Sequence, residues 1–132
     1  KKKLYFFNKK KKIDPKSRLF NKELGGGCIL DLGCYPSSFS LLIGSLVGNV
    51  SKDNLRLHNV VKQIGETEVD IDSSAELLFQ GGFKSKIFAS FKNNLGSGSV
   101  IIGEKGTIIF LLVFTLIILD FIIEFMIITV SN

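Results

Sequence analysis

The chain has 132 residues, of which 45% are apolar, with 12 phenylalanines and no tryptophan. This length allows one domain with a modest core, and the composition excludes general disorder. The net charge is +5, but seven of the 17 basic residues lie in residues 1–12, and the other ten face twelve acidic residues, a net of −2. The basic balance therefore belongs to the first twelve residues and not to a nucleic-acid interface of the fold.

The first twelve residues are predicted to form a basic, frayed arm, because they hold seven lysines and no acid. Contact of this arm with nucleic acid or an anionic membrane is the less favoured interpretation. Asp14-Pro15 marks the break before ordered structure, since proline disfavours helix in the residue before it. Residues 13–110 are then expected to form the domain, and residues 111–132 an apolar tail.

Residues 25–48 are predicted to be a helix with a glycine-rich entry. Three consecutive glycines permit backbone conformations or close approaches that a Cβ would forbid. Apolar residues then recur at helical spacing and would form the buried stripe: Leu32, Tyr35, Phe39, Leu42, Ile43 and Leu46. Pro36 either kinks this helix or lies in the first turn of a regular helix that begins near Tyr35.

Asp31 and Tyr35 are four residues apart, so a helix would place them on one face near its N-terminal end. An acid in a first helical turn is most often there for the helix dipole, which is the alternative to a chemical role. Cys28 and Cys34 are predicted to be reduced thiols, which fits a cytoplasmic protein, and no spacing of Cys and His predicts a metal site.

The chain after residue 53 has the alternation of β-strands. Residues 54–64 read as a strand with Leu55, Leu57 and Val61 on one face, and His58 on the other, where it is expected to be solvated. Residues 70–80 and 83–93 alternate around Gly-Gly, which predicts a β-hairpin. Residues 99–102 and 107–110 are predicted to form two further strands joined by a tight turn.

The segment of residues 108–130 has 19 apolar residues out of 23. Its length suits a membrane helix, but Asp120 and Glu124 make insertion costly. Its isoleucine content also suits buried strand, so a membrane span is the less favoured interpretation and the structure of the segment stays open.

The run DPKSRLFNKELGGGCILDLGCYPSSFSLLIG closely resembles the start of the C-terminal domain of the Gfo/Idh/MocA oxidoreductases, whose pattern is GGGxLxDxGxH or GGGxLxDxGxY. It most resembles the subgroup of glucose-fructose oxidoreductase, dimeric dihydrodiol dehydrogenase and xylose dehydrogenase. The likeness continues more weakly to about residue 110. The resemblance implies an α+β fold, in which the long helix packs on one face of a mostly antiparallel sheet. The other face of the sheet would form a homodimer interface, and an apolar face would fit that role.

The resemblance implies the substrate-binding and dimerisation part of an NAD(P)-dependent oxidoreductase that acts on a sugar, polyol or dihydrodiol. Tyr35 would be the catalytic acid/base, Asp31 would orient it or the substrate hydroxyl, and Arg18 would meet the substrate. NAD or NADP would be held mainly by a nucleotide-binding domain, because this sequence contains neither GxGxxG after a strand nor a Glu-Lys-Pro motif. Such a part alone would be inactive. A non-enzymatic, membrane-tethered or oligomerising module with a basic arm is the alternative.

Overall fold

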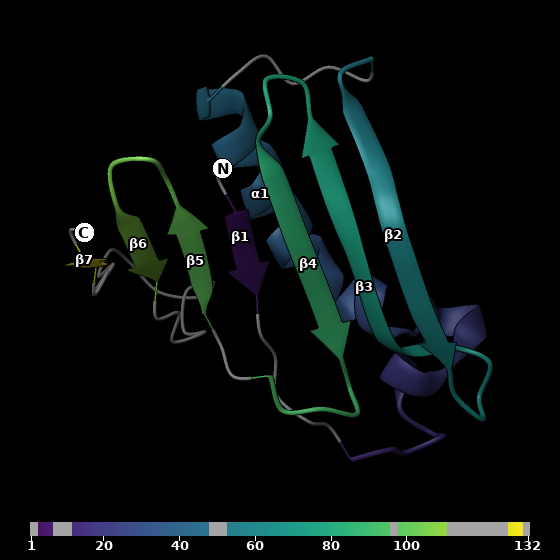
Figure 1. Ribbon diagram of the computed structural model, residues 1–132. Helices are drawn as coiled ribbons and strands as arrows, with labels where there is room; N and C mark the ends of the chain where they lie inside the picture. Colours follow the sequence, from purple (N-terminus) through teal and green to yellow (C-terminus); the bar gives the residue numbers. More distant parts are fainter. Residues whose placement is uncertain (1–2, 7–11, 48–52, 96–97, 111–126, 131–132) are drawn as a thin grey trace, which may run out of the picture.

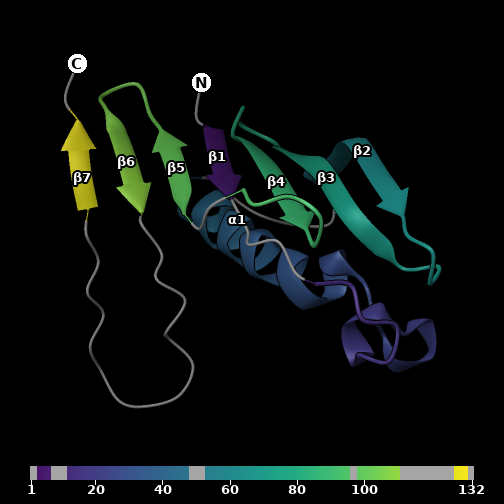
Figure 2. The same ribbon diagram turned by 90° about the horizontal axis from the view of Figure 1, so that it is seen from below.

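The computed structural model describes residues 3–6, 12–47, 53–95, 98–110 and 127–130. Its strands lie in one layer with a helix packed across one face (Figures 1 and 2). The strands are β1 (Lys3–Phe6), β2 (Leu55–Ile64), β3 (Asp70–Phe79), β4 (Lys84–Ser90), β5 (Ser99–Ile102), β6 (Thr107–Phe110) and β7 (Ile127–Val130). The helices are the short 3-10 turns η1 (Arg18–Phe20) and η2 (Lys22–Leu24), the π-helix η3 (Ile29–Gly33) and the α-helix α1 (Cys34–Val47). The predicted α+β class is confirmed.

The layer consists of two antiparallel sheets, β1-β5-β6-β7 and β2-β3-β4, which meet where β1 lies beside β4 (Figure 1). The predicted hairpin is β3–β4, and Gly81 and Gly82 both adopt positive φ in its turn, at 94° and 88°. β5 and β6 are joined by the predicted turn, in which the Gly103 N–H donates to the Gly106 carbonyl at 2.8 Å. The predicted strands β2 to β6 are therefore confirmed, and β2 to β4 were located by their period-two alternation.

The prediction of a frayed arm is wrong for Lys3–Phe6, which form β1 and pair with β5. Leu4, Tyr5 and Phe6 follow the first lysines, and aromatic residues favour strands. The seven lysines predicted a solvated arm, whereas the short apolar run between them forms a strand. The remaining described part of the predicted arm is Lys12, which precedes the first 3-10 turn as irregular chain.

A β-bulge changes the predicted faces of β2. Leu57 lies opposite Leu77, but the register shifts at Asn59, which has φ of 48°, and Val61 then lies opposite Ser74. Because side chains alternate along a strand, this one-residue shift moves Val61 to the face away from Leu57. The prediction that Leu57 and Val61 share a face is therefore wrong.

The helix buries a narrower stripe than its apolar pattern predicted. Its fully buried residues are Pro36, Ser40 and Gly44, four apart, with Phe39 and Ile43 partly buried beside them. Of the remaining residues of the predicted stripe, Leu32 is buried within η3, whereas Tyr35, Leu42 and Leu46 are exposed, to 39%, 54% and 74%. A Cβ at Gly44 would collide with the Phe79 ring, so the small residues let the helix approach the sheet closely.

Pro36 lies in the first turn of α1, as one of the two interpretations had it, and the π-helix η3 precedes it directly. Proline cannot donate a hydrogen bond to the residue 32 carbonyl, and its ring crowds that carbonyl in a regular α-helix. The wider π-turn relieves this conflict while the chain stays helical.

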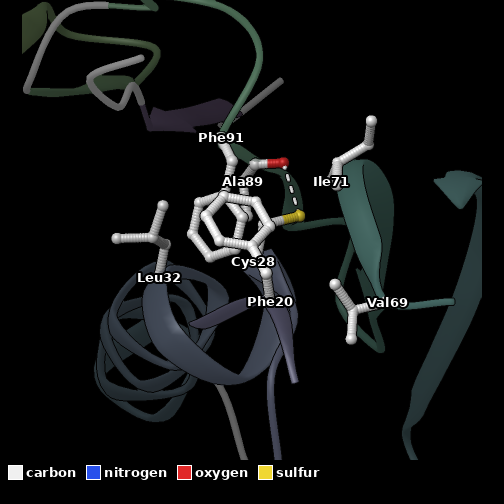
Figure 3. Packing of buried hydrophobic residues seen from close by; sticks show 7 residues of the cluster. All are labelled: Phe20, Cys28, Leu32, Val69, Ile71, Ala89 and Phe91. Atoms are coloured by element: carbon white, nitrogen blue, oxygen red, sulfur yellow. Dashed lines mark hydrogen bonds between the residues drawn. The ribbon is translucent and has the colours of Figure 1, made fainter. Parts of the chain in front are cut away.

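Two clusters of buried residues hold the helix to the sheet. One lies under α1 and contains Ala75, Leu77, Phe79, Phe83 and Ile87. The other, which we call the Phe20 cluster, lies under the glycine loop and η3 (Figure 3) and contains Phe20, Cys28, Leu32, Val69, Ile71, Ala89 and Phe91. Beside the first cluster, the Ser40 hydroxyl donates to the Pro36 carbonyl and is 2.6 Å from the Ser85 hydroxyl, so this fully buried polar pair is satisfied.

The sheet face away from the helix is charged over β2–β4, in contrast to the apolar open face expected for a dimer interface. Glu76 accepts a 2.6 Å hydrogen bond from the Lys86 ammonium and lies 3.0 Å from the Asn59 amide nitrogen. These contacts, with Lys86 the strongest, hold the pKa of Glu76 below its usual range. His58, 3.7 Å from Glu76, is exposed on this face as predicted.

Both described ends of the apolar segment of residues 108–130 are strands, since β6 and β7 pair antiparallel through Ile108–Thr129 and neighbouring pairs. The residues between them lie outside the described residues, so the prediction against a membrane span there stays a prediction. By length and composition alone, the helical stretch Lys22–Val47 could also cross a membrane, with mean hydropathy 1.3. Core helices of soluble proteins meet the same criterion, so it carries no argument here.

Candidate active site at the start of the helix

The glycine-rich loop is built by close backbone packing. Gly25 ends η2 in the left-handed conformation, with φ of 69°. The Gly26 N–H donates to the Asn21 carbonyl at 2.8 Å, and a Cβ on Gly26 would lie 2.7 Å from both the Asn21 and the Leu19 carbonyl oxygens. This site leaves no room for a side chain. The loop therefore fixes the point at which the chain enters the helix.

The next glycine makes room for a carboxylate from the sheet. Gly27 has φ of 122°, and a Cβ there would collide with the Asp70 side chain. Asp70 Oδ2 accepts from the Ile29 N–H at 2.8 Å and from the Cys28 thiol at 2.9 Å, and Ser73 Oγ lies 3.3 Å away. A residue of β3 thus satisfies a donor at the first turn of η3, a role that nearby side chains usually perform.

Asp31 and Arg18, two of the three predicted site residues, are brought together. Arg18 Nη2 lies 3.2 Å from Asp31 Oδ1, with the Asp31 side chain 17% exposed and the Arg18 side chain 58% exposed. Arg18 comes from η1, which Ser17 caps by accepting from the Leu19 N–H. An ion pair this exposed adds little stability. Its main effect is to hold a guanidinium group beside the carboxylate at the open end of the helix.

Tyr35, the third predicted residue, is the second residue of α1, one turn beyond Asp31. Its side chain is exposed and belongs to neither buried cluster. The N-terminal end of a helix favours negative charge, and Arg18 brings a cation to the same end. An acid, a phenol and a guanidinium group therefore lie along one short stretch of the helix surface.

Asp70 is the site residue that sequence reasoning missed. Its position at the start of a strand was predicted, but its contact with Ile29 spans 41 residues of sequence. No local pattern indicates that a strand carboxylate caps a distant helix. The only indirect signal was the glycine at position 27, which a capping side chain needs as free space.

The two cysteines differ in environment. Cys28 is fully buried, and its thiol lies 3.2 Å from the Ala89 carbonyl (Figure 3), while Cys34 is exposed. Burial, together with the hydrogen bond to Asp70, raises the pKa of Cys28 from 9.0 to about 12. The Cys28 thiol therefore stays protonated at physiological pH and donates in a fixed place, while Cys34 is the accessible thiol.

This difference predicts that only Cys34 reacts with a thiol reagent in the native chain. At pH 8, the folded protein is expected to release one equivalent of thionitrobenzoate from Ellman's reagent, and the Cys34→Ser variant none, because the thiolate is the nucleophile. Unfolding in guanidinium should release the second equivalent. Reaction of native Cys34→Ser at the rate of the unfolded chain would contradict the buried, protonated thiol.

Because the pKa of Cys28 is raised on folding, the contribution of Cys28 to the free energy of unfolding is complete below pH 9 and falls as the pH rises toward 12.

A groove of about 550 Å³ is lined by residues of the helix start and of β2 and β3, Asp70 among them. Its walls are mainly apolar, and Asp31, Tyr35 and Arg18 are not among its lining residues. It is lined by Ile29, Ser37, Leu57, Val60, Ala75, Leu77 and Ile87, among others. The groove offers an apolar surface, whereas proton transfer needs the polar groups beside it. Among the described residues, no group of three His, Cys, Asp or Glu could hold a metal ion.

A comparison with protein families supplies the identity. Residues 4–109 match the family model described as the GFO/IDH/MocA C-terminal domain. The chain belongs to the GFO/IDH/MocA family. No curated protein matches the chain. The GFO/IDH/MocA match begins within β1 and ends within β6, so it includes the glycine loop, the helix, the β2-β3-β4 sheet and most of the other sheet, but not β7.

GFO/IDH/MocA proteins are in general NAD(P)-dependent oxidoreductases. The described residues of this domain do not fit a dinucleotide site, because their strand pairs are all antiparallel, whereas such sites form at the carboxyl ends of parallel strands. The described residues therefore offer no parallel-strand site for a dinucleotide.

Proposed function

We propose that this GFO/IDH/MocA domain is the substrate-binding part of an NAD(P)-dependent oxidoreductase acting on a sugar, polyol or dihydrodiol. The observation that supports the proposal is the contact between Arg18 and Asp31 at the start of the helix that also carries the exposed Tyr35, in a domain of this family. When bound, the nicotinamide supplies hydride transfer. The domain's own residues bind the hydroxyl-bearing carbon and manage the hydroxyl proton. The family match does not favour the non-enzymatic module.

In this proposal Tyr35 exchanges the proton of the reacting hydroxyl as general acid/base. A phenol ordinarily loses its proton well above neutral pH, so a neighbouring cation is needed to stabilise the phenolate. Arg18 provides one cation at this end of the helix. Asp31, held by Arg18, orients the substrate hydroxyl by accepting a hydrogen bond from it. Arg18 keeps further donors that can bind substrate oxygens.

We further propose that the domain forms a homodimer through the sheet face away from α1. We also propose that the protein belongs to the subgroup of the family that contains glucose-fructose oxidoreductase. The charged Glu76–Lys86 network on this face means that such an interface would depend on polar contacts. A dimer of this kind should therefore weaken with salt.

The test is made in the protein that joins this domain to a nucleotide-binding unit, found by reading the coding sequence on both sides for GxGxxG and Glu-Lys-Pro. Tyr35→Phe in that protein is expected to lower kcat by about 10²–10⁴-fold, the usual contribution of general acid–base catalysis. Dehydrogenase assays with NAD and NADP across sugars, polyols and dihydrodiols would measure it. Tyr5→Phe, at the other tyrosine of the chain, is the matched control. Unchanged turnover in Tyr35→Phe would remove Tyr35 from the mechanism.

A further inference from the structure

We propose that Asp70 of β3 is a positioning residue that sets the orientation of the helix start carrying Asp31 and Tyr35. What it positions is an active site only if the proposed function holds, but the positioning itself is a property of the fold. The inference comes from the polar contacts between the sheet and the first turn of η3, which the reaction itself does not use.

The first turn of the helix lacks a local cap. The Cys28 side chain, at the N-cap position, makes no capping hydrogen bond to the turn that follows. The Ile29 N–H is instead taken by Asp70 Oδ2 at 2.8 Å, and the Asp31 N–H by the Gly27 carbonyl at 3.1 Å. The exposed backbone donors of a helix start must be satisfied, and the sheet here satisfies the first of them.

The Asp70 carboxylate is itself held in place. Its Oδ2 receives the Cys28 thiol at 2.9 Å and lies 3.3 Å from Ser73 Oγ, and its other oxygen fills the space that Gly27 leaves free. Asp70 is also fixed along the chain, because it lies opposite Ile64 at the end of the β2–β3 ladder. The carboxylate therefore transmits the position of the sheet to the helix.

The groups that would respond are close in sequence to the capped amide. Asp31 is two residues beyond Ile29, and Tyr35 follows one turn later. An uncapped helix frays from its first turn, which here contains the Asp31 carboxylate that Arg18 contacts. Loss of Asp70 should therefore change the surroundings of Tyr35 before it unfolds the domain.

The test follows Tyr35 directly in the full chain, without any enzyme assay. The chain has two tyrosines and no tryptophan, so 3-fluorotyrosine in a Tyr5→Phe background gives a single ¹⁹F signal from Tyr35. In Asp70→Ala we expect that signal to shift and broaden. We also expect the Ile29 and Asp31 amides to exchange about tenfold faster, while thermal unfolding stays cooperative. Asp70→Asn keeps an oxygen acceptor for the Ile29 N–H. It should therefore largely restore the ¹⁹F signal of Tyr35 and the slow exchange of the Ile29 and Asp31 amides.

The matched control is Asp72→Asn, which changes the next carboxylate of β3, paired with the Asn93 amide. It should leave the Tyr35 signal unchanged. An unchanged signal and unchanged Ile29 exchange in Asp70→Ala would overturn the proposal. If Asp70→Ala does not fold, Asp70→Glu carries the test, because the displaced carboxylate must then move the Tyr35 signal, and an unmoved signal would overturn the proposal equally.

The outcome is separable from that of the proposed function. A shifted Tyr35 signal in Asp70→Ala, together with full activity of Tyr35→Phe in the joined protein, would leave the positioning role and reject the catalytic one. If both hold, Asp70→Ala in the joined protein should lower kcat, because the frayed first turn displaces Asp31 and Tyr35 from the reacting geometry.

Discussion

Replacing Phe20 with alanine is expected to lower the free energy of unfolding by about 3–5 kcal/mol, the usual cost of removing a buried phenylalanine ring. Phe20 is 2% exposed in the Phe20 cluster, and its ring centroid lies 5.1 Å from that of Phe91 (Figure 3). The ring joins η1 to the sheet directly beneath the glycine loop. Its loss leaves a cavity at the place where the site is anchored. Urea denaturation followed by circular dichroism would measure the change.

The matched control is Phe88→Ala, because Phe88 is a half-buried phenylalanine of β4 outside both buried clusters. Its loss should cost clearly less than the loss of Phe20. Equal losses from the two variants would mean that the Phe20 cluster contributes nothing beyond general apolar burial.

Gly26→Ala is the second variant for which we expect a large effect, about 3 kcal/mol of destabilisation, at the upper end of what overpacking commonly costs. The added Cβ would lie 2.7 Å from two carbonyl oxygens, of Asn21 and Leu19, and both belong to the backbone. No side-chain rotation can relieve this contact, so the loop itself must move. Because the loop leads into η3, we also expect the ¹⁹F signal of Tyr35 to shift.

Gly25→Asn is the control for this variant. A Cβ at Gly25 would meet only the Leu30 side chain at 3.9 Å, and asparagine tolerates the left-handed φ of 69° better than most residues. The Asn variant should therefore lose at most about 1 kcal/mol. A Gly26→Ala variant as stable as Gly25→Asn would show that the loop is not packed as closely as the structure has it.

Much of the fold could be predicted from local pattern. The alternation around Gly81-Gly82 predicted the β3–β4 hairpin, because a strand with one buried face repeats every two residues. The same rule failed within β2, since the bulge at Asn59 depends on pairing with β3 and leaves no clear mark in the sequence. β1 was missed because four residues among lysines are too short to show any period.

The helix shows where apolar pattern misleads. Leu42 and Leu46 were predicted to be buried, but the contact with the sheet is made by Pro36, Ser40 and Gly44. Close packing against Phe79 requires small residues, and a hydrophobicity pattern does not count serine or glycine as core. The face of α1 that packs against the sheet was therefore determined by the small volume of its side chains and not by their hydrophobicity.

For the site, the resemblance of the GGGxLxDxGxY run selected Asp31 and Tyr35, and the structure shows that Arg18 contacts Asp31. The catalytic roles of these residues stay predictions. Asp70 could not have been selected, because its partner Ile29 is distant in sequence and the contact exists only after the sheet and the helix are assembled.

The position of β1 has a practical consequence for anyone trimming this protein. The strand is one edge of its own ladder, next to β5, and also lies beside β4 of the other sheet (Figures 1 and 2). A shortened version starting at residue 13, chosen to discard the lysines, would delete the strand at which the two sheets meet. Solubility tags and domain boundaries are therefore better placed ahead of Lys3 than after it.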